Sequence, residues 1–104
     1  MPVAQLTLEL RIDHAQSLKD RRQVVRSLKE KIQHGFNVSV AELDEALAWN
    51  SATLGFAAIS NSRDYLAGLM QQLESAVTRL ANDQGAEIAD SYWTFLDDST
   101  GSSE

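Results

Sequence analysis

Apolar and polar residues alternate along residues 6–12, which is the period-two pattern of a strand with one buried face. Helical spacing replaces this pattern over residues 18–32, where the apolar positions fall on one side. Ser17 with Asp20 three residues later resembles a capping box in which Asp replaces the usual Glu or Gln. Gly35 supplies the residue expected just past a helix end. The first two elements are therefore a half-buried strand and an amphipathic helix.

Four further elements follow from the same patterns. Strands are expected over residues 36–41, 52–60 and 87–96, and a second helix over about 63–82. The connection over residues 42–51 contains no glycine or proline. We expect it to form a helical turn or a short link, with Leu43, Leu47 and Trp49 packed inward.

The order strand, helix, strand, strand, helix, strand predicts an α+β protein with a ferredoxin-like βαββαβ two-layer sandwich. Right-handed crossovers place both helices on one face of a four-stranded antiparallel sheet. We expect one domain over residues 1–96 and a disordered polar tail over residues 97–104.

The other face of this sheet would be open. It would carry Thr7, Arg11, Asn37, Ser39, Thr53, Ala57 and Ile59. Gly55 indicates a central strand that something approaches closely. The last strand is ambiguous, because Ile88 and Tyr92 share one parity while the two other aromatic residues take the other. If those two join the open face, they form an apolar patch that a second copy could cover. The expected interface of this homodimer is Ala57, Ile59, Trp93 and Phe95.

Charge is unevenly distributed along the 104 residues. The formal net charge is −6, yet residues 1–31 carry seven of the nine bases and only four acids, a local balance of +3. Residues 32–104 carry −9. An acidic body argues against general affinity for nucleic acid or anionic lipid, whereas a concentrated basic segment can still be a docking face.

Four bases of the first helix fall on one flank at helical spacing: Lys19, Arg22, Arg26 and Lys29. We call them the basic stripe. Cations at this spacing can follow a phosphate backbone, and they would position RNA without reading its sequence. The alternative is a solvated helix face. Arg21 lies nearer the apolar side, so we expect it to pack along its stem or to pair with an acid.

Composition excludes several other classes. There is no cysteine, so disulfides, thiol nucleophiles and cysteine-ligated metals are absent. No apolar run approaches membrane-spanning length and no signal pattern starts the chain, which predicts a cytoplasmic protein without membrane partners. With 43% hydrophobic and 23% charged residues, the composition is that of a globular domain.

No catalytic constellation is visible, so we expect a protein that is not an enzyme and needs no cofactor. His14 and His34 lie at opposite ends of the first helix and cannot readily share a site. Glu42, Asp44 and Glu45 form a close carboxylate cluster, but no further ligands are spaced to complete a cation shell. The sequence therefore predicts no metal site.

The amino-acid sequences of several segments resemble one known family. These segments are residues 17–28, 36–42 and 52–55, together with Trp49 and the Ser60-Asn61 pair. They resemble the YlxP-like bacterial family of small proteins of unknown function. The resemblance implies a ferredoxin-like fold and, in many bacteria, a gene placed among those for transcription and translation factors, including ribosome-binding factor A. It implies no activity and no catalytic residues.

The chain departs from this family at two places. Gln16 stands where many relatives have His, and Glu45-Ala46 follows Asp44 where a His-containing stretch is common. These departures argue against an essential His at either place.

Two hypotheses of different classes remain. The first is a non-catalytic factor that docks on ribosomal RNA, or on a ribosomal surface that includes ribosomal proteins, through the basic stripe. The second is a homo-oligomeric interaction or ligand-sensing module that uses the open sheet, with the stripe merely solvated. A hydrolase like the acylphosphatases of this fold is a distant third, because their loop signature is absent.

Overall fold

The computed structural model describes residues 1–44 and 48–96. Six elements follow one another along the chain: β1 (Val3–Arg11), α1 (Leu18–Gly35), β2 (Ser39–Glu42), β3 (Ser51–Ile59), α2 (Arg63–Asp83) and β4 (Glu87–Phe95). The expected order is confirmed. The expected domain of residues 1–96 contains all six, and the expected tail over residues 97–104 lies outside the described residues.

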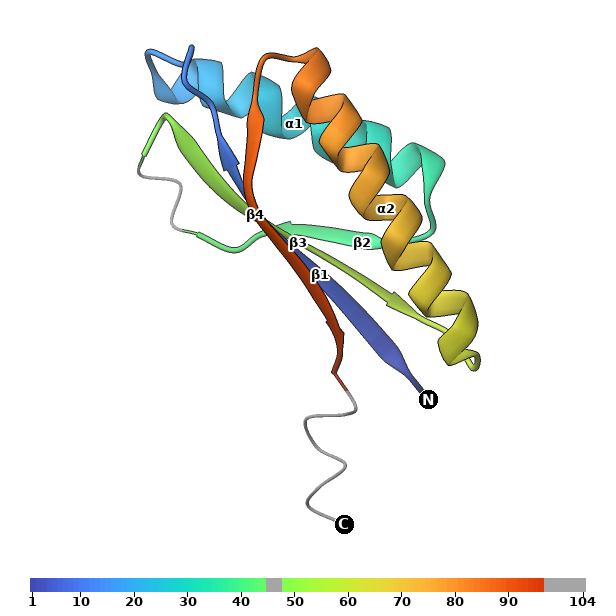
Figure 1. The fold of residues 1–104 in the computed structure, drawn as a ribbon. Coiled ribbons are helices and arrows are strands. Elements are labelled where there is room, and N and C mark those ends of the chain that lie inside the picture. Colours follow the sequence, from blue (N-terminus) through green and yellow to red (C-terminus); the bar gives the residue numbers. More distant parts are fainter. Residues whose placement is uncertain (45–47, 97–104) are drawn as a thin grey trace.

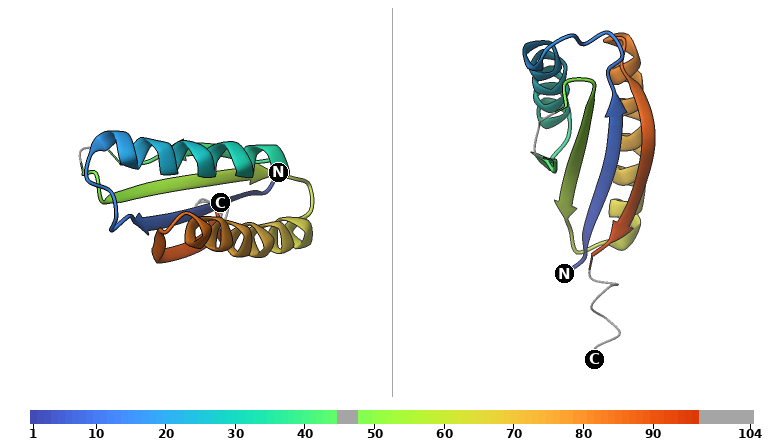
Figure 2. Two further views of the ribbon diagram at one scale, coloured as in Figure 1. Left: turned by 90° about the horizontal axis from the view of Figure 1, so that it is seen from above. Right: turned by 90° about the vertical axis from the view of Figure 1, so that its left-hand side faces the viewer.

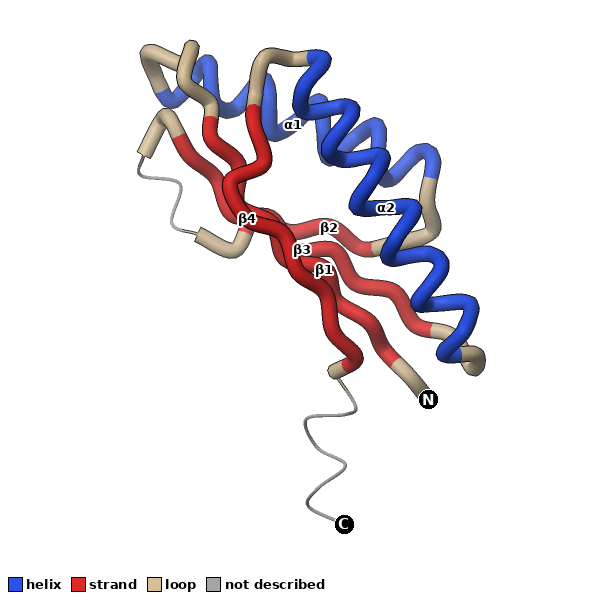
Figure 3. Tube along the Cα trace, in the orientation of Figure 1, coloured by secondary structure: helices blue, strands red, loops and turns tan. Residues whose placement is uncertain are grey.

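The four strands form one antiparallel sheet in the order β2-β3-β1-β4. Both helices lie on the same face of this sheet (Figures 1 and 3). Seen from above, α1 and α2 run side by side with the strands visible between them (Figure 2). The fold is the expected ferredoxin-like sandwich, and it leaves the other sheet face without a helix layer.

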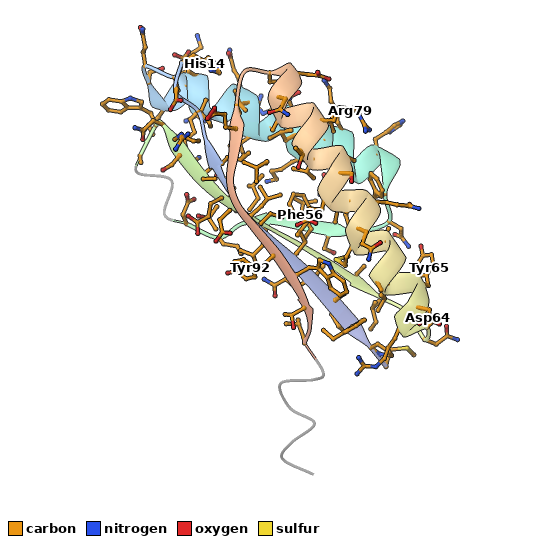
Figure 4. All side chains as sticks on the ribbon, in the orientation of Figure 1. His14, Phe56, Asp64, Tyr65, Arg79 and Tyr92 are labelled. Carbon is orange, nitrogen blue, oxygen red and sulfur yellow. The ribbon has the colours of Figure 1, made fainter. Side chains whose placement is uncertain are left out.

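The core fills the space between the sheet and the two helices. Every second residue of β1 points into it, and Phe56 of β3 is fully buried in it (Figure 4). The largest buried side chains are those of Leu6, Leu8, Leu10, Ile12, Leu28, Ile32, Leu54, Leu66, Met70, Leu73 and Val77. Together they form one continuous hydrophobic cluster.

Side chains fix the first turn of each helix. The hydroxyl of Ser17 accepts a hydrogen bond from the Asp20 amide at 3.2 Å, and the Asp20 carboxylate accepts one from the Gln16 amide at 3.0 Å. This arrangement is a capping box displaced by one residue, in which the Asp20 carboxylate binds the amide of Gln16 in place of that of Ser17. Ser62 caps α2 in the ordinary way, accepting from the Tyr65 amide at 3.1 Å.

A β-bulge in β4 settles which face its aromatic residues occupy. Glu9 pairs with Asp90 but Leu10 pairs with Ile88, so Ala89 is the extra residue. Trp93 and Phe95 lie across from Leu6 and Ala4, whose side chains are buried on the helix side of the sheet, and both pack against the core. Their expected place on the open face is therefore wrong, since the bulge reverses the parity within the strand.

The segment around β2 also differs from expectation. The strand is Ser39–Glu42 and not 36–41, and the Leu43 amide continues the pairing with β3 by donating to the Thr53 carbonyl. Residues 45–47 of the expected helical turn lie outside the described residues. Leu43 and Trp49 are half-exposed and not packed inward, and Leu47 lies outside the described residues. The close approach expected at Gly55 is confirmed, because a Cβ there would lie 2.8 Å from Leu43 Cδ1.

Deleting Ala89 tests the role of the bulge. Without the extra residue, either Ile88 or the Trp93 and Phe95 pair must leave the core face. We expect the free energy of unfolding to fall by about 2–4 kcal/mol, as for large-to-small core substitutions. Urea unfolding measures it, and Ala89→Ser, which keeps the residue count, should change stability by less than about 0.5 kcal/mol. Equal stability of the deletion variant and the wild type would contradict the assignment.

Candidate functional site

The basic stripe lies on the exposed flank of α1. Lys19, Arg22 and Arg26 are exposed and Lys29 is half-buried. The stripe spans about 15 Å along the helix axis, given a rise of about 1.5 Å per residue. None of the four cations makes an ion pair within residues 1–44 and 48–96. The helix therefore presents four positive charges at fixed spacing that form no ion pair with the described residues, while Glu30 lies beside them in the two hollows that border α1.

A groove of about 480 Å³ runs between this flank of α1 and the edge strand β2. Arg22, Arg26 and Lys29 line it from the helix, and Glu42 lines it from the strand. Leu18 adds an apolar contribution at the N-terminal end. A second hollow on the solvent side of the helix contains Lys19 and shares two of the same arginines. The stripe thus borders two concave surfaces.

Arg21 turns away from the stripe and is 4% exposed. Its Nη1 donates to Glu42 Oε1 at 2.9 Å, and its Nη2 donates to the two carboxylate oxygens of Asp44 at 3.0 and 3.3 Å. Its Nε donates to the Ser51 carbonyl at 2.9 Å. The expectation that Arg21 pairs with an acid is confirmed. One guanidinium joins α1 to the end of β2 and to the start of β3.

The same contacts explain why the groove remains positive. The groove contains two acids, Glu30 and Glu42, and Glu42 is held by Arg21 together with Asp44, which follows it in the chain. Asp44 also accepts a hydrogen bond from the Thr53 amide at 3.1 Å. Glu42 and Asp44 are therefore not partners of the stripe. Among the described residues no cluster of three or more metal-binding side chains exists, and Glu45 of the expected carboxylate cluster lies outside them.

The expected oligomer interface is divided between the two faces of the sheet. Ala57 and Ile59 lie on the open face, where Ile59 is 64% exposed, whereas the two aromatic residues of β4 face the helices. Sequence reasoning missed two residues that are half-exposed on the open face: Leu43, which lies against Gly55, and Tyr92, which pairs with Thr7 in the strand register. Tyr92 is labelled in Figure 4. Alternation along β4 left two possible faces for Tyr92, and the position of the bulge decides between them.

The remaining candidate groups form no site together. His14 packs near Gly85, which has a φ of 78°, and His34 lies in the last turn of α1. Arg11 at the end of β1 forms an ion pair at 2.8 Å with Glu87, which lies opposite it at the start of β4. The hydrogen bond and the charge of Glu87 raise the pKa of Arg11 above its ordinary value. No helix within the described residues is long and apolar enough to span a bilayer.

Comparison with known proteins gives the family. Residues 3–93 match the family described as "Protein of unknown function (DUF503)". The chain belongs to this family. A DUF503-type stretch of 49 residues is 39% identical to the "Uncharacterized protein YlxP" of Bacillus subtilis (strain 168), covering 47% of this chain and 53% of that one. The match thus spans about half of that relative, and the resemblance inferred from the sequence is confirmed.

Solved structures share the fold of this DUF503 protein at low identity. A hydantoinase/carbamoylase family amidase from Burkholderia ambifaria has a TM-score of 0.54 at 10% identity, over 91% of this chain and 27% of that one. A C-terminal segment of the alpha subunit of aIF2 from Pyrococcus abyssi has a TM-score of 0.50 at 11% identity, over 92% of this chain and 51% of that one. At such identities the likeness shows the fold alone.

Replacing Arg21 with Leu tests the buried ionic contact. Glu42 and Asp44 would lose their shared partner, but their side chains are 34% and 29% exposed, so water can partly replace it. We expect the free energy of unfolding to fall by about 1–3 kcal/mol, less than for a fully buried pair. Urea unfolding measures the change. Arg22→Leu, the matched change at the exposed neighbour, should stay within about 0.5 kcal/mol, and equal losses in both variants would refute the special role of Arg21.

Proposed function

We propose that this protein is a non-catalytic binding factor that docks on RNA through the basic stripe of α1, with ribosomal RNA as the expected partner. The observation that carries the proposal is that four cations share one helix flank and no acid of the described residues pairs with them. Phosphate groups would supply the missing negative charge, and their binding releases counterions from the RNA.

The distribution of charge supports a single docking orientation. Residues 32–104 carry a net charge of −9 and would be repelled by a polyanion. The helix α1 is the exception. An approaching RNA would therefore be oriented toward the stripe before contact, because opposite charges attract while the acidic body is disfavoured.

The rigidity of α1 supports the same proposal. Its first turn is capped by Ser17, and its apolar side is buried by Val25, Leu28 and Ile32. The backbone positions of the four cations are thus fixed before binding, which lowers the entropy lost when phosphate is bound. Arg22 and Arg26 can each make paired hydrogen bonds to one phosphate, which Lys cannot.

Simultaneous charge reversal of Lys19, Arg22, Arg26 and Lys29 to Glu tests the proposal. For four contacts to single-stranded RNA, we expect the wild-type affinity to fall roughly 50-fold between 50 and 200 mM salt. The fourfold variant should lose measurable binding to purified ribosomal RNA in a fluorescence-anisotropy titration. Its circular dichroism should match that of the wild type, because the four side chains make no ion pairs with the described residues.

A double variant of matched charge change controls for net charge. Lys31 and Arg79 are exposed and lie off the stripe, Arg79 on α2 (Figure 4). Their joint reversal to Glu changes the net charge as much as reversal of Arg22 and Arg26. Only the second pair should weaken RNA binding more than about tenfold. Equal losses would mean that net charge alone matters, and unchanged binding in the fourfold variant would refute the stripe as the docking face.

The open sheet face supports a second candidate, a homodimer. Ile59 is 64% exposed, and Leu43 and Tyr92 are half-exposed on the same face. Thr7 lies between Gly55 and Tyr92 in the strand register and is only 9% exposed, so part of this face is already covered by the chain itself. A second copy would cover the remaining apolar surface around Ile59 and Ala57.

Ile59→Arg tests this homodimer. A two-fold interface brings the same surface of both copies together, so the new guanidinium would be buried without a partner and close to that of the second copy. The variant should therefore sediment as a monomer at concentrations where the wild type dimerises. Sedimentation velocity over a range of concentrations measures it. Tyr65→Arg, at an equally exposed aromatic residue on α2, should leave the dimer intact. A wild type that stays monomeric at high concentration would exclude this candidate.

A further inference from the structure

The outer edge of β2 carries backbone groups that lack a partner. The amide of Leu43 donates to the Thr53 carbonyl at 2.8 Å, so these two residues form a hydrogen-bonded pair. Along an antiparallel ladder, hydrogen-bonded pairs alternate with pairs whose backbone groups point away from the partner strand. Val40 and Glu42, which lie opposite Phe56 and Leu54, therefore direct their N–H and C=O groups away from β3.

The neighbouring ladder leads to the same assignment. The Ser60 amide donates to the Pro2 carbonyl, so these two residues form a hydrogen-bonded pair just beyond the ends of β1 and β3. Hydrogen-bonded pairs recur at every second position of the ladder, and Leu6–Phe56 is one of them. Phe56 is thus bonded to β1 and not to β2. Among the described residues, no hydrogen bond of the backbone groups of Val40 or Glu42 is found outside the strands. Two amides and two carbonyls are left open at this edge.

The opposite edge of the sheet is protected. Ser91, Trp93 and Phe95 direct their backbone groups outward from β4 by the same alternation. The Ser91 amide donates to the carboxylate of Asp90 at 2.9 Å, and the Thr94 hydroxyl lies 3.4 Å from the Phe95 carbonyl, which it donates to. The bulge further distorts this strand. The bulge is a recognised way to prevent strand addition, and the two side-chain contacts occupy one outward amide and one outward carbonyl of β4. The pairing of β2 with β3 shows no bulge within the described residues, although β2 is short and carries the charged Glu42.

The open edge of β2 lies beside the groove under α1. The groove of about 480 Å³ is lined by Arg22, Arg26 and Lys29 and has Leu18 and Val25 among its apolar residues. Its two acids are fewer than its cations, and one of them, Glu42, is held by Arg21. An occupant that complements both the edge and the groove must therefore be extended and acidic.

We propose that β2 binds an extended acidic segment of a partner protein, which pairs with Val40 and Glu42 as a fifth strand of the sheet. Alternate side chains of the added strand face the groove, because successive residues of a strand point to opposite faces. Acidic side chains at those positions meet Arg22, Arg26 and Lys29. The backbone bonds supply affinity for any extended chain, and the cations supply selectivity for acidic ones.

This inference goes beyond RNA docking, because it also needs the backbone of β2, although it shares three cations of α1 with the RNA proposal. RNA needs the side chains of α1, including Lys19, which does not line the groove. The peptide needs the backbone of β2, which RNA does not use. Because Arg22 and Arg26 border both surfaces, the two ligands should compete. A change at the backbone of β2 separates the two proposals, because it leaves all four cations in place.

A nine-residue fluorescent peptide of alternating Glu and Val, blocked at both ends, is the probe. Val40→Pro removes one edge amide and leaves every charge in place, so binding measured by fluorescence anisotropy should weaken at least about tenfold. Val40→Ala, which loses the same side chain but keeps the amide, should bind within about twofold of the wild type. RNA binding should be unchanged in both variants.

A second probe avoids any change to the protein. Two versions of the same peptide carry N-methyl groups on alternate residues, one version on the odd and one on the even positions. In one of them the methyl groups block the amides that face β2, and that version should lose binding. A peptide with Lys in place of Glu should not bind. Loss of binding in Val40→Pro together with loss in one methylated register supports the fifth strand. Full binding of Val40→Pro, or of both methylated peptides, would reduce the contact to charge attraction with α1 and overturn the proposal.

Discussion

The buried guanidinium of Arg21 is the contact on which the surface of this protein depends. It is 4% exposed, and its hydrogen bonds reach Glu42, Asp44 and the Ser51 carbonyl. It therefore joins α1 to the edge strand β2 and to the neighbouring strand β3. Removing a cation and its carboxylates from water is costly, and such clusters contribute modest net stability. Its larger effect is positional, because it holds β2 at one distance from α1 and so defines the groove.

The same contact fixes the register of the chain that follows β2. Glu42 and Asp44 must both face Arg21, so Leu43 between them must face the opposite side of the sheet. There it contacts Gly55, where any side chain would crowd it. A glycine in the middle of a central strand weakens that strand, and the contact with Leu43 explains its presence. One ionic cluster thus accounts for the groove, the exposed leucine and the glycine.

Most of the fold could be predicted from hydrophobic spacing, because each element has a simple period. Alternation identified β1 and β3, and helical spacing located both helices, with Ser17 marking the start of the first. The errors arose where the period changes within an element. Ala89 reverses the parity inside β4, and no residue type marks a bulge of this kind. Leu43 was expected to pack inward because it is apolar, whereas the contacts of its neighbours Glu42 and Asp44 with Arg21 turn it to the open face.

The candidate site was predictable to the same extent. The stripe could be located by counting turns, and the separate role of Arg21 followed from its position nearer the apolar side. Its partners could not be identified, because Glu42 and Asp44 are 21 and 23 residues away and meet it only through the sheet. The open edge of β2 was equally hidden. Which amides of a strand face outward depends on the pairing register, and the register is a property of two strands together.

The net charge of −6 would by itself predict that this protein avoids anionic partners. Net charge acts over distances at which salt screens it, since the Debye length is about 8 Å at physiological ionic strength. Within that range of a bound anion, the local charges dominate. Arg21 removes Glu42 and Asp44 from this local balance by holding both, so Arg22 and Arg26 act on a ligand without competition from them. A buried arginine that takes up two acids therefore makes its exposed neighbours available for binding.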